Sequence, residues 1–398
     1  MHNRYRSENP SGEDRVVDTE TRALSCAGHA VANFGRRSDD IATWPLVRRA
    51  SLPLKVVASK SVRDELEDVL RRERPDVVHV HNTFPLLTPS VLNACAKQKV
   101  PVVATFHNYR LECANGAFFR DGAVCHDCTG HSGLAAISHR CYRGSALATA
   151  PVVAGKLLYR SAWRDIPSAY IFISESQRRA LTRTGLPLER SFVKWNLVPR
   201  LEPRSRFVKR PRVAYLGRLD EAKGLPVLMR AWDMLQGQAA PESLELSIAG
   251  SGPLEEEVRR WASTRRNVEM LGLLDRQGCA DLLAGASAAI LASSWEETFG
   301  LVVVEAFASG VPVIAPAHGS LPELVEDGVD GDLFRPGDPA DLARLLARGA
   351  ADPYHWETLG LAARRAYEKR FDPDTNLAQL EAIYHFAIAN NRAEKVRG

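Results

Sequence analysis

The sequence lacks any segment that could cross a membrane as a helix, because no run reaches the roughly 18 apolar residues that a span requires. The apolar stretch Ser145–Tyr159 is too short and contains Lys156. A secretory signal is also missing, since residues 1–20 are polar and charged. Internal repeats and low-complexity tracts are absent as well. These absences exclude membrane-spanning, secreted and repeat-built proteins, and we expect a protein of the cytoplasm.

The Gly-x-Gly-x-x-Gly fingerprint is also missing, which argues against a nicotinamide cofactor. The net charge of +4 is unevenly distributed. Residues 1–200 carry 29 Lys and Arg against 19 Asp and Glu, whereas the remainder carries 23 against 29. A basic first half favours anionic partners such as phosphates, a membrane face or nucleic acid, but solvated helix faces explain it equally well.

At 398 residues the chain is long enough for two domains of ordinary size. Short buried strands alternate with helical stretches in two successive series, and a polar linker, 201–210, separates them. Alternating strands and helices predict parallel sheets with helices on both faces, so the fold class is α/β with two doubly wound, Rossmann-like domains facing a cleft. The predicted domains are 1–205, 206–370 and a C-terminal helix, 371–398, packing back on the first domain.

A basic loop follows the first strand of the second domain, in Gly217-Arg-Leu-Asp-Glu-Ala-Lys-Gly224. Its glycines allow the backbone to approach a ligand closely. Arg218 offers a planar fork for phosphate oxygens and Lys223 a point charge. The loop therefore indicates phosphate binding, with an ordinary basic loop before a helix as the alternative.

Two carboxylates, Glu297 and Glu305, stand eight residues apart in EETFGLVVVE. On one continuous helix they would point about 80° apart. Thr298 and Gly300 offer a cap and a break, so we expect Glu297 in a loop and Glu305 inside a helix. The helix start would then present backbone N–H groups to an anion, with one carboxylate on either side. The expected N–H donors belong to Gly300, Leu301 and Val302.

These motifs, together with IAGSGPLEEEV and LPELVEDGVDG, resemble the retaining family-4 glycosyltransferases of GT-B fold in order and spacing across about 150 residues. The resemblance implies that Arg218 and Lys223 bind the diphosphate of a nucleotide-sugar donor. It also implies that Glu297 contacts the transferred sugar and that Glu305 holds the ribose. Family members typically have two glycines where this chain has His318-Gly319.

The N-terminal residues resemble the acceptor-side loop of the same family, with Ser11 and Gly12 near sugar and phosphate. Family members have an apolar strand before this loop, whereas this chain begins at the loop itself. We therefore predict that the first strand is missing and that the natural start lies upstream.

Two histidines end neighbouring predicted strands, His81 in VVHVHN and His107 in VVATFHN. Both strand ends should face the cleft. The family carries a histidine at the position of His107 near the reacting sugar, so His107 is predicted in the active site with Glu297, and His81 on the acceptor side. A structural role for a lone histidine is the alternative.

The insert 113–141 contains four cysteines in the pattern C-x11-C-x2-C-x12-C. One C-x2-C knuckle with two flanking thiols fits a tetrahedral structural zinc site, while reduced, unligated thiols are the alternative. The expected ligands are Cys113, Cys125, Cys128 and Cys141, with His126, His131 or His139 as substitutes.

The combined prediction is an enzyme that transfers a sugar from a nucleotide-diphosphate sugar to a glycan or lipid-linked acceptor with retention, in polysaccharide or glycolipid biosynthesis. Catalysis should need no cofactor or metal, because Arg218, Lys223 and the helix start stabilise the leaving diphosphate. The basic first half would help the protein sit on an anionic membrane surface. The alternatives are a catalytically impaired relative or a zinc-containing nucleic-acid-binding protein, although no nucleic-acid partner is expected.

Overall fold

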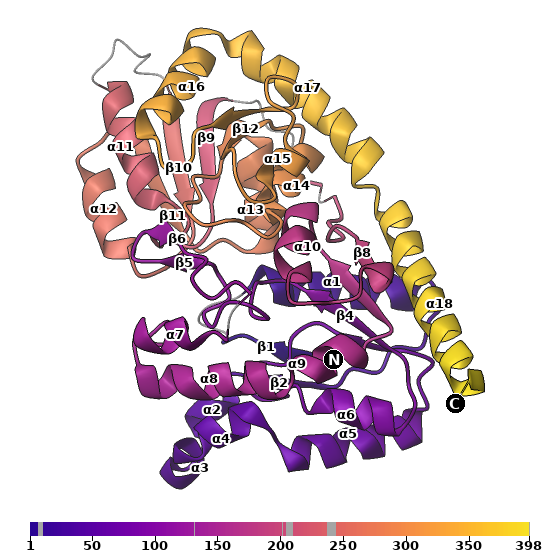
Figure 1. The fold of residues 1–398 in the computed structure, drawn as a ribbon. Coiled ribbons are helices and arrows are strands. Elements are labelled where there is room, and N and C mark those ends of the chain that lie inside the picture. The colour runs from indigo at the N-terminus through magenta and orange to yellow at the C-terminus, as the bar shows by residue number, and fades with distance from the viewer. Residues whose placement is uncertain (7–10, 131, 201, 204–209, 237–243, 398) are drawn as a thin grey trace. The chain divides into compact units, whose positions relative to one another are not determined.

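The computed structural model describes residues 1–398 except 7–10, 131, 201, 204–209, 237–243 and 398. The chain forms two compact units (Figure 1). The N-terminal unit comprises Met1–Phe118, Cys125–Leu197 and Asp374–Gly398, and the C-terminal unit comprises Phe119–Val124 and Val198–Pro373. The linker predicted at 201–210 lies largely outside the described residues.

The C-terminal unit is built on a six-stranded parallel sheet in the order β11-β10-β9-β12-β13-β14. Numbered within this unit, that order is 3-2-1-4-5-6, the arrangement of a doubly wound nucleotide-binding fold. Its strands are β9 (Arg210–Leu216), β10 (Glu245–Ala249), β11 (Val268–Gly272), β12 (Ala286–Ile290), β13 (Val313–Pro316) and β14 (Gly331–Phe334). Its helices are α11 (Leu225–Gln236), α12 (Glu255–Ser263), α13 (Arg276–Ala284), α14 (Leu301–Ala308), α15 (Leu321–Leu324), α16 (Pro339–Ala351) and α17 (Pro353–Arg370).

Apolar strands and amphipathic helices form the core of this unit. Val213–Leu216 of β9 and all but one residue of β12 are buried, as expected of central parallel strands covered on both faces. Trp232 of α11 is the largest fully buried side chain and packs in the same cluster as Leu228 and Trp356. Burial of this kind contributes roughly 1.5–3 kcal/mol per large apolar side chain, which fixes the sheet and the loops at its edge.

The N-terminal unit contains a four-stranded parallel sheet, β3-β4-β7-β8, and a parallel pair, β1-β2. Its parallel strands are β1 (His2–Arg4), β2 (Gly35–Arg37), β3 (Val78–Val80), β4 (Val102–Phe106), β7 (Ala169–Phe172) and β8 (Ser191–Val193). Its helices include α1 (Gly12–Cys26), α2 (Asp40–Thr43), α3 (Leu46–Ala50), α4 (Leu52–Val57), α5 (Lys60–Glu73), α6 (Val91–Lys97), α7 (Leu134–Ser138), α8 (Ala146–Leu158), α9 (Arg160–Asp165) and α10 (Glu175–Thr182), with a 3-10 turn at Leu188–Arg190. The short hairpin β5 (Phe119–Arg120) and β6 (Ala123–Val124) groups with the C-terminal unit.

The prediction that the first strand is missing is wrong, because His2–Arg4 form β1. This strand pairs with β2, and a bridge between His2 and Asn82 joins it to the chain just after β3. The Asn3 N–H donates to the Asn82 carbonyl at 2.8 Å. A three-residue strand of polar residues carries no apolar signal, so its sequence resembles a loop.

The helix α18 (Pro373–Arg397) lies almost wholly in the segment that groups with the N-terminal unit. Leu380, Ile383 and Ala387 of α18 are buried in one cluster with Val103 and Ile171 of that unit's sheet. Among the described residues, no helix combines the length and apolar character needed to span a membrane.

Candidate active site

In the C-terminal unit, backbone hydrogen bonds connect the loops at the carboxyl ends of β9, β12 and β13. The Ser294 N–H donates to the Ala222 carbonyl at 2.9 Å, and the Ser320 N–H donates to the Glu297 carbonyl at 3.0 Å. At Gly224, φ is +71°, and a Cβ would lie 1.8 Å from the Ala292 carbonyl oxygen. Only glycine allows this approach, which places the basic loop after β9 directly beside the loop that carries Glu297.

Lys223 and Glu297 form the central ion pair of this loop cluster. Lys223 Nζ lies 2.6 Å from Glu297 Oε1, and the Ser293 hydroxyl donates to the same oxygen at 2.6 Å. The ammonium also lies 4.9 Å from the centre of the Trp295 ring, within cation–π range. The side chain of Glu297 is 6% exposed, whereas that of Lys223 is 31% exposed. The cation is thus held by a buried carboxylate while part of it faces solvent.

Glu297 is ionised in this setting. Burial by itself raises the pKa of a carboxyl, but the charge of Lys223 and the hydrogen bonds from Lys223 and Ser293 outweigh it and lower the pKa of Glu297 below its ordinary value. A buried carboxylate that loses such a partner is left with an uncompensated charge. The pair is therefore an electrostatic unit in which each group depends on the other.

Arg218 is the more exposed cation of the basic loop. Its Nε lies 3.0 Å from Asp220 Oδ2, and its side chain is 55% exposed. Asp220 Oδ1 also accepts from the Lys223 N–H at 2.8 Å, so one carboxylate orients both basic residues. Arg218 keeps guanidinium donors available for an anion at the surface.

The break predicted at Thr298–Gly300 is present, and it places the two carboxylates in different elements. Gly300 is the N-cap of α14 with φ +98°, Glu297 lies in the preceding loop, and Glu305 lies within α14 as a partly buried residue. The first N–H groups of a helix have no intrahelical partners and carry the positive end of its dipole. The residues that supply these groups are Gly300, Leu301 and Val302.

His318 occupies the loop after β13, where the resemblance led us to expect glycine. One of its nitrogens, Nε2, lies 2.9 Å from the Ser293 carbonyl oxygen, so Nε2 carries the proton and donates. A Cβ at the next residue, Gly319, would lie 2.8 Å from both N and O of Glu297. The loop after β13 therefore packs on the backbone of Glu297. His318 connects this loop to Ser293, whose hydroxyl also donates to the Glu297 carboxylate.

His81 and His107 meet in the N-terminal unit, at the carboxyl ends of β3 and β4. Their Nδ1 and Nε2 atoms lie 3.0 Å apart, and the rings stack with centroids 5.3 Å apart. Burial is the main cause that lowers the pKa of His107 to about 3 and the pKa of His81 well below its usual range. Both imidazoles are consequently neutral near pH 7 and can share one proton in a hydrogen bond.

Behind these histidines lies a buried polar network that the sequence prediction missed. Lys194 Nζ donates to Glu20 Oε1 at 2.8 Å, and Glu20 Oε2 lies 3.8 Å from Nε2 of His81. His79 bonds the hydroxyls of Thr105 and Tyr384 at 2.7 and 2.8 Å. Glu20, His79 and His81 are close enough for a metal within the described part of the chain, but Lys194 already compensates the Glu20 charge.

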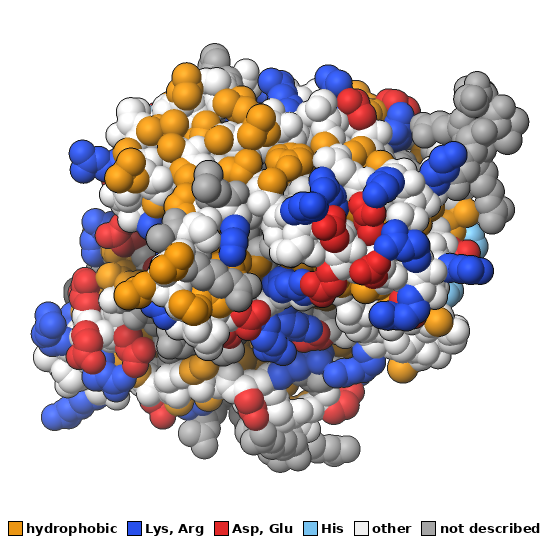
Figure 2. All heavy atoms as spheres, turned by 90° about the horizontal axis from the view of Figure 1, so that it is seen from below, with side chains coloured by type: hydrophobic (Ala, Val, Ile, Leu, Met, Phe, Trp, Pro, Cys, Tyr) orange, Lys and Arg blue, Asp and Glu red, His pale blue; other side chains and the backbone are white. Residues whose placement is uncertain are grey.

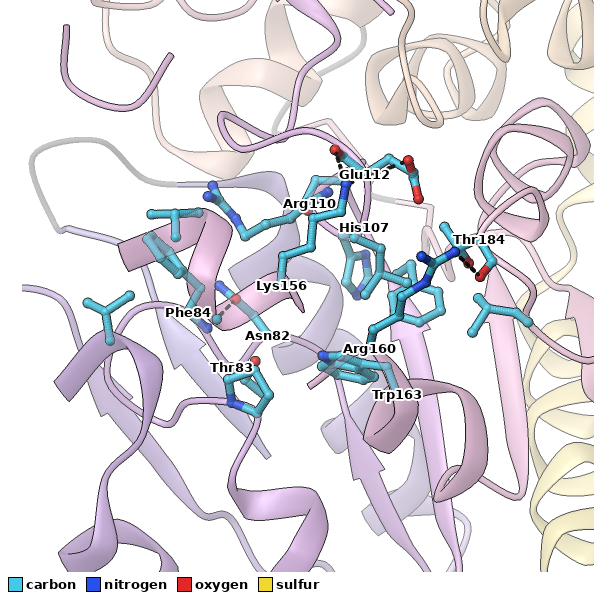
Figure 3. Close-up of a pocket in the computed structure, with 18 of the residues that line it drawn as sticks. Asn82, Thr83, Phe84, His107, Arg110, Glu112, Lys156, Arg160, Trp163 and Thr184 are labelled. Carbon is cyan, nitrogen blue, oxygen red and sulfur yellow. Dashed lines mark hydrogen bonds and ion pairs between the residues drawn. The ribbon is translucent and has the colours of Figure 1, made fainter. Parts of the chain in front are cut away.

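A pocket of about 120 Å³ opens beside the two histidines, entirely within the N-terminal unit (Figure 3). It brings together residues from Val56 to Leu186, including Arg110, Lys156, Arg160 and Trp163. The predicted acceptor-side residues Ser11 and Gly12 do not line it. Instead, Ser11 caps α1 by accepting from the Glu13 N–H at 3.2 Å, and Gly12 begins that helix.

The four cysteines of the insert are not gathered into a metal site. All are free thiols, and within the described residues no three of their sulfur atoms lie within 4.8 Å of one another. Cys113 donates to Asn115 Oδ1 at 2.9 Å, and Cys128 is buried in an apolar cluster with Val152 and Val153. Cys125 is partly buried; of the substitutes, His126 is exposed, His139 Nδ1 lies 3.6 Å from Asp127 Oδ2, and His131 is outside the described residues. This arrangement does not fit a closed four-sulfur zinc site.

Most of these pocket and network residues escaped prediction because they are scattered. Glu20, Lys156 and Lys194 belong to α1, α8 and the segment after β8, so no short motif contains them. Lys156, a charged residue within the apolar run 145–159, was the one indication in the sequence of a buried polar contact, since a buried charge needs a partner.

Comparison with known protein families covers most of the chain. Residues 10–199 match Glycosyltransferase Family 4, and residues 210–352 match Glycosyl transferases group 1. The chain is 32% identical over 196 residues to D-inositol 3-phosphate glycosyltransferase of Streptomyces scabiei, covering 46% of this chain and 43% of that protein. It is 32% identical over 164 residues to sulfoquinovosyl transferase SQD2 of Arabidopsis thaliana, covering 40% and 31%. The chain thus spans less than half the length of these curated relatives.

Solved structures share the fold over nearly the whole chain. Sucrose-phosphate synthase of Thermosynechococcus elongatus superposes with a TM-score of 0.67 at 18% identity, covering 98% of this chain and 96% of that one. HepE of Anabaena in complex with UDP-glucose gives a TM-score of 0.63 at 17% identity, covering 98% and 99%. With parallel α/β sheets in both units and both family matches in chain order, the protein belongs to the GT-B glycosyltransferases of family 4 and group 1.

Proposed function

We propose that this protein transfers a sugar from a nucleoside-diphosphate sugar to an acceptor, with retention of anomeric configuration and without a metal in catalysis. The observation that carries the proposal is the Lys223–Glu297 pair, in which Lys223 of the loop after β9 lies 2.6 Å from Glu297 of the loop before α14. This arrangement suits a ligand with a diphosphate and a sugar, because it places a partly exposed cation and a helix N-terminus beside a buried carboxylate.

In the proposed complex, Lys223 bridges the donor diphosphate and Glu297, because an ammonium has three N–H donors and Glu297 engages only part of them. Arg218 adds a second cation from the exposed side of the loop. The first N–H groups of α14 then receive a phosphate oxygen. As the bond between sugar and diphosphate breaks, negative charge grows on the leaving group, and these fixed donors stabilise it.

Glu305 is assigned to the ribose and Glu297 to the transferred sugar, since carboxylates accept hydrogen bonds from vicinal hydroxyls. His107 is assigned to the reacting sugar from the N-terminal unit. Because burial keeps the imidazole of His107 neutral, with a pKa of about 3, it can donate or accept a hydrogen bond without bringing charge.

The donor and acceptor classes that we propose are suggested by what the relatives are named for or were solved with. HepE of Anabaena was solved with UDP-glucose, and UDP-sugars are therefore the first donors to screen. Enzymes named for an inositol phosphate and for a sulfoquinovosyl group are among the curated relatives, so a glycan or a glycolipid is proposed as the acceptor.

The proposed location is the cytoplasm, at the inner face of an anionic membrane. Large apolar side chains are exposed on short helices of the N-terminal unit, among them Leu46 and Val47 of α3 and Leu147 and Leu158 of α8, at 66–87% exposure. Figure 2 shows hydrophobic side chains gathered on one face beside lysines and arginines. Sedimentation with phosphatidylglycerol vesicles, but not with phosphatidylcholine vesicles, would support this location.

A thermal-shift screen of nucleoside-diphosphate sugars tests the proposal directly, because a ligand that binds the folded state raises its stability. Glu305→Ala should abolish the shift, whereas Glu256→Ala, on the exposed face of α12, should keep it. Product NMR then reports the anomeric configuration, and assays with EDTA report metal dependence. If no nucleotide sugar shifts the wild-type protein, the donor assignment is wrong.

A further inference from the structure

The pocket of the N-terminal unit has an unusual excess of positive charge. Its lining includes four basic side chains, Arg110, Lys156, Arg160 and Arg164, against a single carboxylate, Glu112. The pocket's histidines add no charge near pH 7, because burial depresses their pKa values. The lining therefore carries a net positive charge in a partly enclosed space.

Two of these cations are already paired with carboxylates. Lys156 Nζ donates to the Glu112 carbonyl at 2.8 Å and lies 3.7 Å from Glu112 Oε2, and its side chain is 14% exposed. Arg164 bonds both oxygens of Asp165, at 2.7 and 3.0 Å. Their charges are locally compensated.

The other two cations have no carboxylate within ion-pair distance, although the charge of Arg110 still acts on the buried carboxyl of Glu13. Arg110 donates to the carbonyls of Ala114 at 2.9 Å and Asn115 at 3.5 Å, and its guanidinium lies 4.2 Å from the centre of the Phe84 ring. Among the described residues, the acceptor for Arg160 is the Thr184 carbonyl at 3.4 Å. Within the described chain, neither guanidinium has a carboxylate oxygen within 4.0 Å. Each guanidinium has five N–H donors, so donors remain for an anionic ligand.

The position of the pocket fits a substrate site. His81 and His107 stand at the carboxyl ends of parallel strands β3 and β4, where α/β folds bind ligands. Figure 3 shows Arg110, Lys156 and Arg160 around the same pocket as His107 and Trp163. An anion bound there would lie beside the histidine that we assign to the reacting sugar.

The rest of the lining is apolar. The apolar side chains of the wall include Phe84, Phe106, Leu111, Val152 and Trp163, together with Pro89 and Pro151. Apolar walls exclude water and strengthen the attraction between a guanidinium and an anion. They also accept an alkyl chain or the apolar face of a sugar.

We propose that this pocket binds a phosphoryl group of the acceptor, held by Arg110 and Arg160, with the adjoining apolar part of the acceptor against Trp163 and Val152. Planar guanidinium forks match phosphate oxygens, and two unpaired forks with one compensated lysine suit a phosphate or diphosphate ester. The assignment of this ligand as the acceptor rests on the proposed glycosyl transfer. The phosphoryl site itself rests on the pocket.

Two sources could supply this chemistry, a phosphorylated sugar or a lipid diphosphate, and calorimetric titration separates them. The probes are glucose 1-phosphate and farnesyl diphosphate, with methyl glucoside and farnesol as their uncharged counterparts. The full chain is first saturated with the nucleoside diphosphate selected by the donor screen, so that the site in the C-terminal unit is filled. If the screen selects none, the titration runs without it.

At least one phosphorylated probe should bind about tenfold or more tightly than its uncharged counterpart. Tighter binding of farnesyl diphosphate assigns a lipid carrier, and tighter binding of glucose 1-phosphate assigns a phosphorylated sugar. Arg160→Gln should weaken the better probe about tenfold, or about 1.4 kcal/mol. Arg110→Lys, which keeps the charge but loses the fork, should also weaken it while the melting temperature stays within a few degrees.

Arg72→Gln is the matched control, because it removes the same charge from an exposed guanidinium on α5 that is paired with Glu73. It should leave binding unchanged. Equal affinity for charged and uncharged probes, or equal losses in Arg72→Gln and Arg160→Gln, would overturn the phosphoryl site. If the donor screen fails while glucose 1-phosphate or farnesyl diphosphate still binds, glycosyl transfer is refuted and the phosphoryl site stands.

Discussion

In the C-terminal unit, the charged groups of the candidate site meet within loops at one edge of the sheet, and Lys223 and Arg218 remain partly exposed. In the N-terminal unit, the corresponding strand ends carry buried, neutral histidines backed by the Glu20–Lys194 pair, whose side chains are 7% and 2% exposed. The loops of the C-terminal unit thus leave cations accessible to a ligand. The strand ends of the N-terminal unit bury their charged pair and present neutral hydrogen-bonding imidazoles.

Under the proposed function, this contrast would correspond to a division of work between the two units. A diphosphate donor is doubly charged and its leaving group gains charge during the reaction, so exposed cations in fixed positions serve it best. At the strand ends of the N-terminal unit, the neutral imidazoles of His81 and His107 add no charge, and the cations that line the same pocket come from α8, α9 and the loop after β4.

The largest expected effect tests the buried pair of the N-terminal unit. Lys194→Met should lower the free energy of unfolding by about 3–5 kcal/mol, because Glu20 would remain charged and buried without its partner. Urea denaturation measures this effect. Lys194→Met/Glu20→Gln should recover most of the loss, and a double variant as unstable as the single one would show that Lys194 acts through packing alone. Donor-induced thermal shifts should persist in both variants.

The next effect tests the exposed pair of the C-terminal unit. Lys223→Ala should reduce turnover about 10²–10³-fold, since one fixed donor to the leaving group is lost. Glu297→Gln should also reduce turnover with the donor. Added to Lys223→Ala, it should not recover the lost turnover, because the two groups act on one ligand. Steady-state kinetics of Lys223→Ala, Glu297→Gln and the double variant measure the coupling. Independent, additive losses would break the view of this pair as one unit.

The pH dependence of stability provides a third test, at Glu13 of α1. Burial raises the pKa of Glu13 to about 8, with the opposing hydrogen bond from Tyr5 at 3.0 Å too weak to prevent it. Between pH 4.5 and about 8 the unfolded state is ionised while the folded state keeps its proton, so stability falls as pH rises through this window.

Glu13→Gln removes this titration. The variant should therefore gain stability relative to the wild type from pH 5 to pH 8, by roughly 3 kcal/mol on the basis of 1.36 kcal/mol per pKa unit. Urea denaturation at four pH values measures it. Glu65→Gln, which alters an exposed ion pair with Arg36, should show no such trend. A parallel pH profile in Glu13→Gln and wild type would contradict the raised pKa.

A smaller effect is expected at His318. His318→Gly removes the bond to the Ser293 carbonyl and restores the glycine expected from the resemblance. Because this bond is neutral, worth about 0.5–1.5 kcal/mol, KM for the donor should change only several-fold, and the range of accepted sugars should widen. Kinetics with a panel of nucleotide sugars measures both. Unchanged selectivity would show that His318 only supports the loop.

The contrast between the two units also explains which parts of the candidate site could be predicted from the sequence. The loop Gly217–Gly224 and the stretch Glu297–Glu305 are short and contiguous, and local rules for glycine, caps and helix starts locate them correctly in the fold. The division into two α/β units also follows from local periodicity. Both depend on interactions between residues that are near one another in the chain.

The site of the N-terminal unit depends on distant pairings and was not predictable in this way. Lys194 meets Glu20 from 174 residues away, and Tyr384 reaches His79 from 305 residues away. The strand β1 was missed because His2, Asn3 and Arg4 are polar and are held by backbone bonds to residues near Asn82. The cysteine spacing predicted a zinc site because spacing alone does not show where the side chains point.

The return of α18 to the N-terminal unit has a consequence for synthesis on the ribosome. The core of that unit contains Leu380 and Ile383, yet residues 198–373 emerge before them and belong to the other unit. At 5–20 residues per second, their translation takes on the order of ten seconds or more. During that interval the nascent N-terminal unit exposes the apolar surface around Val103 and Ile171, until α18 emerges and covers it.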